Sequence, residues 1–269
     1  MLVASVASAK PSNPAFLGIG MQDAQSGQLN GGPPTIGPCM VLSVTRGSGA
    51  KAAGLQPGDL LHEINGTPVA NCDAVQKVVQ AHQPGDAVNV RVARYGRQLV
   101  LNATLLSRDE ILRRRHVGQP IGATDVFVLD EQRTYDLGAL RGKTAVVGWF
   151  DRRCDGCKQV FTKVSDWARG QADKGGAPPM PLAVVAGDPD NAKALGKDIG
   201  SLDVPLAIAE PALYEEFTIP DAERIHFMVV DCRGVVSYVA PVAPNGDDTD
   251  AVLDELFAAA EQASRRTTR

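Results

Sequence analysis

The feature that most constrains the fold is an apolar run that ends in a short polar turn and two cysteines. Residues 145–150 are apolar and fit a buried strand, and a Cys-x-x-Cys motif follows at Cys154 and Cys157. Beyond it, apolar residues recur at helical spacing, at positions 157, 160, 161, 164, 167 and 168. The sequence therefore predicts a strand, a two-cysteine turn and a helix, which is the context that a redox pair requires.

We expect Cys154 to lie at the cap of this helix and Cys157 within its first turn. Unpaired N–H groups and the helix dipole at that end favour a thiolate, and cysteines three apart can form a disulfide. Charges close to Cys154 should tune the pKa of its thiol: Arg152, Arg153 and Lys158 downward, Asp151 and Asp155 upward. We predict Cys154 and Cys157 as the catalytic pair, with pKa-tuning residues Arg152, Arg153 and Asp155.

Two other interpretations of the cysteine pair remain, namely ordinary buried cysteines or half of a zinc site. A zinc site takes about four ligands. The remaining candidate ligands are scattered along the chain, at Cys39, Cys72, Cys232 and His226. We therefore predict no metal and no cofactor.

Four stretches of the second half resemble the thioredoxin-like redoxins of the bacterial cell envelope. They are residues 117–120, 127–130, 137–143 and the strand with its Cys-x-x-Cys, and the resemblance runs from about Val117 to the C-terminal helix. A later strand–turn–strand, residues 227–236, also follows the family pattern. The resemblance implies an α/β thioredoxin-like fold and thiol–disulfide exchange with partner proteins.

This chain departs from the family pattern at two positions. By spacing, Ile225 holds the place of the cis-proline that the family carries just before the 227–236 segment, and the nearest proline is Pro220. Either an insertion at 221–224 displaces the proline or the chain lacks it. Arg153 also stands where the family has an aromatic residue before the first cysteine.

The first half carries a different pattern. Residues 16–21 read Phe-Leu-Gly-Ile-Gly-Met, a Gly/Pro-rich loop is expected over 22–38, and an alternating strand follows at 40–44. Residues 47–66, which include Gly-Leu-Gln-Pro-Gly-Asp-Leu-Leu, closely resemble the PDZ domains of bacterial periplasmic proteases, and the match continues to about Leu106. The resemblance implies a mainly β, partly open barrel with helices that binds protein C-terminal peptides.

The predicted peptide site combines a glycine loop, a strand edge and a helix. Glycines let consecutive N–H groups turn toward a terminal carboxylate, and an exposed strand edge can accept the peptide as an added strand. We place the loop and strand start at Phe16, Leu17, Gly18 and Ile19. A helix should begin near Asn71; its Val75 and Val79 would wall the pocket, whereas Val78 belongs to the core.

We therefore predict two domains: PDZ at 14–106 and thioredoxin-like at 118–264, joined by a linker at 107–117. Ser107 and Glu110 form a capping-box pattern, so the linker should contain a short helix, and its arginines at 113–115 should form a solvated face. A net charge of -4 gives no reason to expect nucleic acid as a partner. No stretch is long enough to span a bilayer.

The N-terminal residues 1–13 read as a signal-peptide remnant or a disordered segment. Ala7 and Ala9 match the small-x-small cleavage pattern, which favours an extracytoplasmic location, and we expect a mature chain from about Lys10. The predicted function is thiol–disulfide exchange with partner recruitment by the PDZ groove. The alternative is a PDZ binding protein whose thioredoxin-like domain is redox-inactive. The sequence leaves the pairing of Cys39, Cys72 and Cys232 open, as well as the redox direction.

Overall fold

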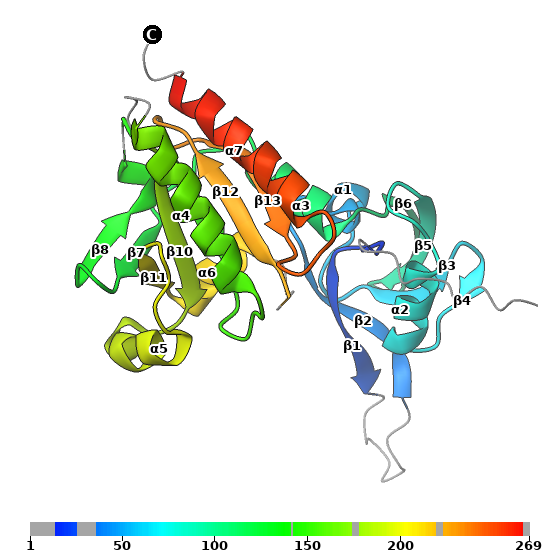
Figure 1. Cartoon of the computed structure of the whole chain (residues 1–269). Helices are drawn as coiled ribbons and strands as arrows, with labels where there is room; N and C mark the ends of the chain where they lie inside the picture. Colours follow the sequence, from blue (N-terminus) through cyan, green and yellow to red (C-terminus); the bar gives the residue numbers. More distant parts are fainter. Residues whose placement is uncertain (1–13, 26–35, 141, 174–177, 219–222, 266–269) are drawn as a thin grey trace, which may run out of the picture. The chain divides into compact units, whose positions relative to one another are not determined.

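The computed structural model describes residues 14–25, 36–140, 142–173, 178–218 and 223–265. The chain divides into two compact units, residues 1–111 and 112–269 (Figure 1). The division falls within helix α3 (Arg108–His116). The predicted signal-peptide remnant at 1–13 lies outside the described residues.

The first unit is a mainly antiparallel sheet with two short helices. The sheet runs β1-β2-β3-β5-β6, with β4 paired to β3 and β1 at one edge. Its elements are β1 (Ile19–Gln25), β2 (Ile36–Val44), α1 (Gly49–Ala53), β3 (Leu60–Ile64), β4 (Thr67–Pro68), α2 (Cys72–Gln80), β5 (Ala87–Arg94) and β6 (Arg97–Thr104). The loop expected over 22–38 is therefore too long, because strand pairing continues to Gln25 and resumes at Ile36.

A buried carboxylate holds one turn of this unit in place. Asp59 is fully buried and accepts hydrogen bonds from Arg94 Nε at 2.6 Å and Nη2 at 2.7 Å. It also accepts from the N–H of Gln56 at 2.9 Å, which closes the Gln-Pro-Gly-Asp turn. Alternate residues of β5, at Val88, Val90 and Val92, point into the core, as a sheet with one buried face requires.

The second unit is a seven-stranded mixed sheet with helices. Its order is β13-β12-β9-β10-β11-β7-β8; β9, β10 and β11 are parallel, and the other pairs are antiparallel. The strands are β7 (Asp125–Val128), β8 (Arg133–Asp136), β9 (Ala145–Trp149), β10 (Met180–Ala186), β11 (Leu206–Ala209), β12 (Ile225–Val230) and β13 (Val236–Val242). The helices are α4 (Cys157–Asp173), α5 (Ala192–Ile199), α6 (Pro211–Phe217) and α7 (Thr249–Arg265), with 3-10 turns at Leu137–Ala139 and Pro189–Asn191.

This connectivity is that of a thioredoxin-like fold. Strand β9 leads through α4 into parallel β10, and the antiparallel pair β12–β13 leads into the closing helix α7. Helices α4 and α7 pack their apolar residues on one face of the sheet, where Phe161, Leu253 and Leu256 contribute to the core (Figure 1). The predicted class, a PDZ-type β unit followed by an α/β thioredoxin-like unit, is confirmed.

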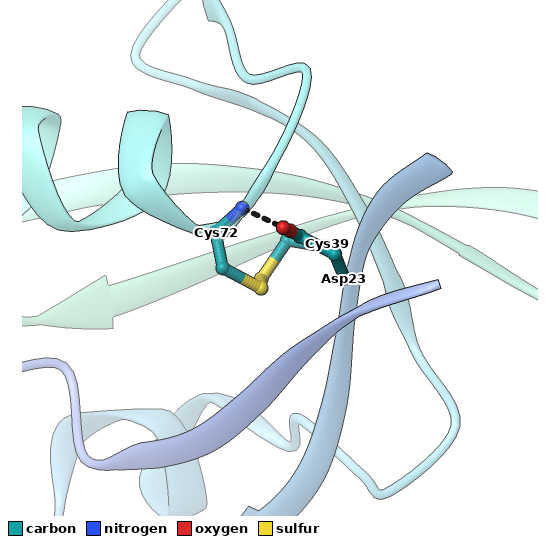
Figure 2. A group of neighbouring side chains, drawn as sticks. All are labelled: Asp23, Cys39 and Cys72. Carbon is teal, nitrogen blue, oxygen red and sulfur yellow. Dashed lines mark hydrogen bonds between the residues drawn. A yellow bond between two sulfur atoms is a disulfide. The ribbon is translucent and has the colours of Figure 1, made fainter. Parts of the chain in front are cut away.

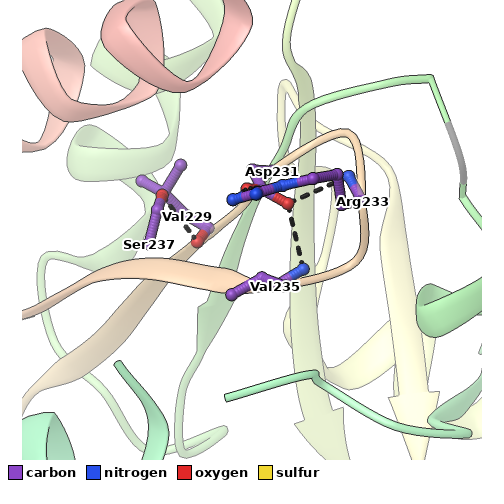
Figure 3. Close-up of polar contacts among 5 residues, drawn as sticks. All are labelled: Val229, Asp231, Arg233, Val235 and Ser237. Carbon is purple, nitrogen blue, oxygen red and sulfur yellow. Dashed lines mark hydrogen bonds and ion pairs between the residues drawn. The ribbon is translucent and has the colours of Figure 1, made fainter. Parts of the chain in front are cut away.

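The hairpin turn between β12 and β13 is organised by the side chain of Asp231 (Figure 3). Its carboxylate accepts from the N–H groups of Arg233 and Val235 at 2.9 and 3.0 Å, and from the Arg233 guanidinium at 2.6 Å. Burial of the carboxyl works against its ionisation, but these hydrogen bonds prevail and hold the pKa of Asp231 below its usual value. The turn is therefore a charge-stabilised connection rather than a loose loop.

The structure bears on two expectations, the solvated arginines of the linker and the missing cis-proline before β12. Of the arginines at 113–115, Arg113 and Arg114 are exposed as expected, whereas Arg115 is buried and its guanidinium donates to the carbonyl oxygens of Glu215 and Glu216. Ile225 is fully buried at the start of β12, paired with Val242. No peptide bond among the described residues is cis, and Pro220 lies outside them, so the position of that proline stays open.

Candidate functional site

The two cysteines of the motif meet at the end of β9. Cys154 and Cys157 are joined as a disulfide, with their Cα atoms 5.7 Å apart. Cys157 is buried, with 3% of its surface exposed, whereas Cys154 is half-buried. A reagent or partner protein approaching this pair therefore reaches Cys154 first.

The helix begins at Cys157, and Cys154 is not its cap. Asp155 and Gly156 form a turn between the cysteines, and the N–H of Val160 bonds the carbonyl of Gly156 as the helix starts. Gly156 has a φ of +81°, a conformation that side chains with a Cβ rarely adopt. This glycine therefore turns the chain, and the direct effect of the helix terminus falls on Cys157.

The link between the cysteines packs against the loop that connects β13 to α7. A Cβ on Gly156 would lie 2.8 Å from Asn245 Oδ1 and 3.0 Å from Pro244 Cβ. The Nδ2 group of Asn245 lies 3.5 Å from the carbonyl of Asp155. The side chain of Thr249 holds this loop in place. Its hydroxyl oxygen lies 2.6 Å from the carbonyl oxygen of Ala243 and 2.7 Å from that of Gly246, and the hydroxyl donates to these carbonyls. The Cys154–Cys157 disulfide ring therefore packs against a loop that hydrogen bonds hold in place.

Two of the charged residues expected near the sulfurs are paired with each other. Arg153 forms a bidentate ion pair with Asp151, with Nε and Nη2 each 2.9 Å from a carboxylate oxygen. The hydrogen bond from Arg153 lowers the pKa of Asp151, and the same bond raises the pKa of Arg153. The guanidinium and the carboxylate carry opposite charges, so they act on a thiolate at Cys154 in opposite directions.

Aromatic stacking supports the end of β9 just before the motif. Trp149 is fully buried and stacks on Phe217 of α6 at 4.7 Å, and Phe217 stacks in turn on His116 at 5.0 Å. Tyr214 meets the edge of Trp149 at 6.3 Å, and its burial raises the pKa of its phenol. These contacts fix the strand end from which the cysteine turn departs.

A pocket of about 590 Å³ opens beside the cysteine turn. Its lining mixes charged and small residues, namely Arg153, Asp155, Glu223, Ala243, Asn245 and Gly246. A surface of this kind can contact the backbone and polar side chains of an extended partner segment. The predicted residues Arg153 and Asp155 line it, whereas Asn245 and its loop were not predicted, because only the fold brings residues 155 and 245 together.

The predicted peptide-site residues of the first unit all line one pocket of about 270 Å³. Phe16, Leu17, Gly18 and Ile19 form one side, and Val75 and Val79 of α2 form the other. Asn71 caps α2, accepting from the N–H of Ala74 at 2.9 Å, as expected. Val78 does not line the pocket and packs on the core. Met21, Gln76, Gln80 and Arg108 are further lining residues that the sequence did not single out.

The glycine loop that lines this pocket is built on Gly18. Gly18 has a φ of +87°, and a Cβ there would lie 2.1 Å from Ser48 Cβ, so only glycine fits. Its carbonyl faces inward and accepts from the N–H of Thr45 at 2.9 Å. In the part of the chain that the structure describes, the N–H groups of Leu17 and Gly18 donate no backbone hydrogen bond. Loops with such unbonded N–H groups are where proteins commonly bind a carboxylate.

A second disulfide joins Cys39 and Cys72 beside this pocket, a pairing that the sequence left open (Figure 2). Cys39 lies in β2 and is fully buried, and Cys72 is the first residue of α2. Asp23 of β1 lies within 4.8 Å of both sulfurs, but these sulfurs are used in the disulfide. Cys232 is a free, half-buried cysteine of the second unit.

Comparison with known proteins gives the first unit its family. Residues 15–105 match the family model described as PDZ domain, and the first unit is therefore a PDZ domain. No curated protein matches the chain. No described helix is long and apolar enough to cross a membrane.

Solved structures resemble each unit separately. The HtrA-type protease AlgW with a decapeptide is 23% identical, with a TM-score of 0.32, over 36% of this chain and 30% of that chain. The HtrA3 PDZ domain bound to the phage-derived ligand FGRWV is 22% identical, with a TM-score of 0.29, over 35% of this chain and 86% of that chain. A Bacteroides thetaiotaomicron protein, named provisionally as a protein disulfide isomerase, is 14% identical over 56% of this chain and 91% of its own, with a TM-score of 0.42.

Proposed function

We propose that the chain is a thiol–disulfide oxidoreductase whose PDZ domain binds the C-terminal peptides of partner proteins. One observation carries the redox part: Cys154 and Cys157 are joined at the start of a long helix, and the half-buried Cys154 lies between Arg153 and Asp155, which both line a pocket. This arrangement gives one accessible sulfur and one protected sulfur, which are the two roles that disulfide exchange needs.

In the reduced protein, exposure makes Cys154 the attacking thiol. Its thiolate attacks one sulfur of a partner disulfide, and the other partner sulfur leaves as a thiolate. The Cys157 thiolate then attacks Cys154 Sγ, releases the second partner sulfur as a thiolate and closes the Cys154–Cys157 disulfide. The partner gains the two electrons and, from water, the two protons that the cysteine pair loses. The reverse sequence oxidises a partner dithiol, and the redox poise of the compartment sets the direction.

The PDZ groove can bind the C-terminal peptide of a partner protein. The nest of Leu17 and Gly18 N–H groups suits a terminal carboxylate, and the apolar Val75 and Val79 suit a peptide's last side chain. The free edge of β1 can take the peptide as an added strand. We expect micromolar binding, which corresponds to about -8 kcal/mol.

Single cysteine variants test the redox role, with oxidised glutathione as the probe. Reduced Cys157→Ser protein should accumulate a mixed disulfide at Cys154, because the resolving thiol is absent, and Cys154→Ser protein should not. Mass spectrometry of quenched samples measures the adduct. If neither variant forms an adduct faster than the free thiol of Cys232 in a Cys154→Ser/Cys157→Ser control, the redox role is wrong.

Matched peptides test the groove. An apolar C-terminal peptide with a free carboxylate should bind in titration calorimetry, and the same peptide with an amidated end should bind at least tenfold more weakly, since about 1.4 kcal/mol is lost with the charged hydrogen bonds. Equal binding of acid and amide would contradict a carboxylate nest at Gly18.

The ion pair between Arg153 and Asp151 favours a second function, a PDZ-based binding protein with a redox-inactive thioredoxin-like unit. That pair places a carboxylate beside the Arg153 guanidinium, which opposes any lowering of the Cys154 thiol pKa by Arg153. Alkylation by iodoacetamide against pH separates the two functions. A Cys154 pKa below the ~8.5 of a free thiol supports exchange, and a pKa at or above it supports the binding protein.

We also propose an extracytoplasmic location. Two disulfides in one chain suit an oxidising compartment, because cytosolic thiols are generally kept reduced. N-terminal sequencing of the protein from fractionated native cells is the test. Intact cytosolic protein that begins at Met1 would contradict the proposal.

A further inference from the structure

Three elements of the PDZ domain are tied together at one point, at the N-terminal end of α2. Cys72 opens α2 and forms the disulfide with Cys39 of β2. The N–H of Cys72 also donates to Asp23 Oδ1 at 2.6 Å, and Asp23 is the register partner of Cys39 on the edge strand β1 (Figure 2). One covalent bond and one hydrogen bond thus link α2 to both strands.

These are the elements that form the peptide groove. Strand β1 supplies Ile19 and Met21 to the pocket, and α2 supplies Val75 and Val79. Val75 lies three residues after Cys72, so less than one helical turn separates the disulfide from the pocket wall. The helix has only nine residues, a length that is marginal without tertiary support. The position of this wall therefore depends on its attachment at Cys72 as well as on the packing of its valines.

We propose that the Cys39–Cys72 disulfide is a redox modification site that sets the peptide affinity of the groove, with a dithiol as its reactant. The oxidised form holds α2 at the spacing from β1 that a peptide strand requires. Reduction frees the first turn of α2 from β2, the wall samples other positions, and affinity falls. The inference rests on the proposed peptide-binding function of the same groove.

Burial decides how the exchange runs. Cys39 is fully buried and Cys72 is half-buried, so an incoming thiolate reaches Cys72 Sγ. The S–S bond breaks, Cys39 leaves as a thiolate, and a mixed disulfide forms at Cys72. The second thiolate of the dithiol then attacks the first sulfur of the same dithiol, which is bonded to Cys72, and releases the Cys72 thiolate. The reactant ends as a disulfide, and Cys39 and Cys72 take up two protons from water, which balances the two protons that the dithiol lost.

The test measures binding of one apolar, free-carboxylate peptide to the full chain in defined redox states. The protein is the Cys154→Ser/Cys157→Ser variant, in which only the PDZ disulfide can change, and a chelator keeps zinc from bridging the reduced sulfurs near Asp23. We expect reduction by dithiothreitol to raise Kd about fivefold to tenfold, as it would if the aligned position of α2 were populated only about 10–20% of the time. Reoxidation should restore the original Kd.

A second variant, Cys39→Ala/Cys72→Ala, provides the control. It should bind with the weaker affinity in both redox states, and circular dichroism should show that it and the reduced protein remain folded. Equal Kd values for oxidised and reduced protein would overturn the inference, as would loss of binding that coincides with unfolding of the domain. Absence of binding in every state would instead refute the proposed groove function.

Discussion

The two disulfides of this chain are built from similar parts and differ in what surrounds them. Each joins a buried cysteine to a half-buried one, and each includes the first residue of a helix. In the PDZ domain the helix residue Cys72 is the accessible one and the strand residue Cys39 is buried. In the thioredoxin-like unit the helix residue Cys157 is buried and the turn residue Cys154 is accessible.

The position of the accessible cysteine determines which sulfur leaves when a thiolate attacks the disulfide. Attack at Cys154 expels Cys157, whose thiolate forms at the N-terminus of a long helix and is stabilised there. Attack at Cys72 expels Cys39, whose thiolate forms within a buried strand with no helix terminus of its own. Since a thiol of lower pKa leaves faster, we expect the Cys154–Cys157 bond to open quickly, as the proposed exchange requires, and the Cys39–Cys72 bond to open more slowly.

The largest expected difference is in stability. Cys39 and Cys72 are 33 residues apart, whereas Cys154 and Cys157 are 3 apart. Loop-closure entropy then predicts that Cys39→Ala/Cys72→Ala loses about 4 kcal/mol of unfolding free energy and Cys154→Ala/Cys157→Ala about 2 kcal/mol. Urea denaturation of the full chain, followed by hydrogen exchange of peptides from each unit, measures both. A larger loss of unfolding free energy for Cys154→Ala/Cys157→Ala would contradict this prediction.

A second effect on stability tests whether the 243–246 loop holds the Cys154–Cys157 ring in place. Gly156→Ala should cost about 1–2 kcal/mol for the left-handed backbone and about 1–3 kcal/mol more for the contact with Asn245 and Pro244. Gly122→Ala is the matched control, because Gly122 has a φ of +75° with nothing within 4 Å. Equal losses for the two variants would show that the 243–246 loop gives way easily.

The two disulfides can also be compared by how fast each one is reduced. With limiting dithiothreitol, the Cys154–Cys157 pair should open at least about tenfold faster than Cys39–Cys72, because its leaving thiolate is the better stabilised. Samples quenched with iodoacetamide at successive times and digested for mass spectrometry give both rates. Faster opening of the PDZ pair would reverse our assignment of the two roles.

The smallest effect concerns charge. Asp151→Asn removes a carboxylate close to Cys154 and releases Arg153, and both changes favour the thiolate. The pH profile of Cys154 alkylation in the reduced protein should move down by about half a unit, because exposed charges are worth no more than about 1 kcal/mol. Asp166→Asn, which breaks a similar pair with Arg169 elsewhere on α4, should leave the profile unchanged.

The sequence predicted the elements that have strong local signals. The strand before Cys154, the cap at Asn71 and the closing helix follow from apolar runs, capping residues and helical periodicity. The groove residues came from the PDZ resemblance, and the structure brings all six to one pocket. Helix α6 was missed because its seven residues are too short for a clear period, although Pro211 at its first position was an available signal.

The remaining features depend on long-range contacts. The pairing of Cys39 with Cys72 is decided by the approach of α2 to β2, which no local pattern records. The wrong placement of Cys154 at the helix cap has a local cause, because the left-handed Gly156 delays the start of the helix by two residues, from 155 to 157. Arg115 was expected in solvent since its neighbours are charged, but the end of α6 offers it two carbonyl oxygens.

The distribution of tryptophan gives the molecule a natural optical label. Trp149 and Trp167 are the two tryptophans of the chain, and both belong to the second unit. Trp149 is stacked on Phe217 and lies five residues before Cys154, so its emission should respond to the oxidation state of that turn and not to peptide in the groove. Intrinsic fluorescence can therefore report the oxidation state of the Cys154–Cys157 pair while calorimetry measures peptide binding by the PDZ domain, without modification of either unit.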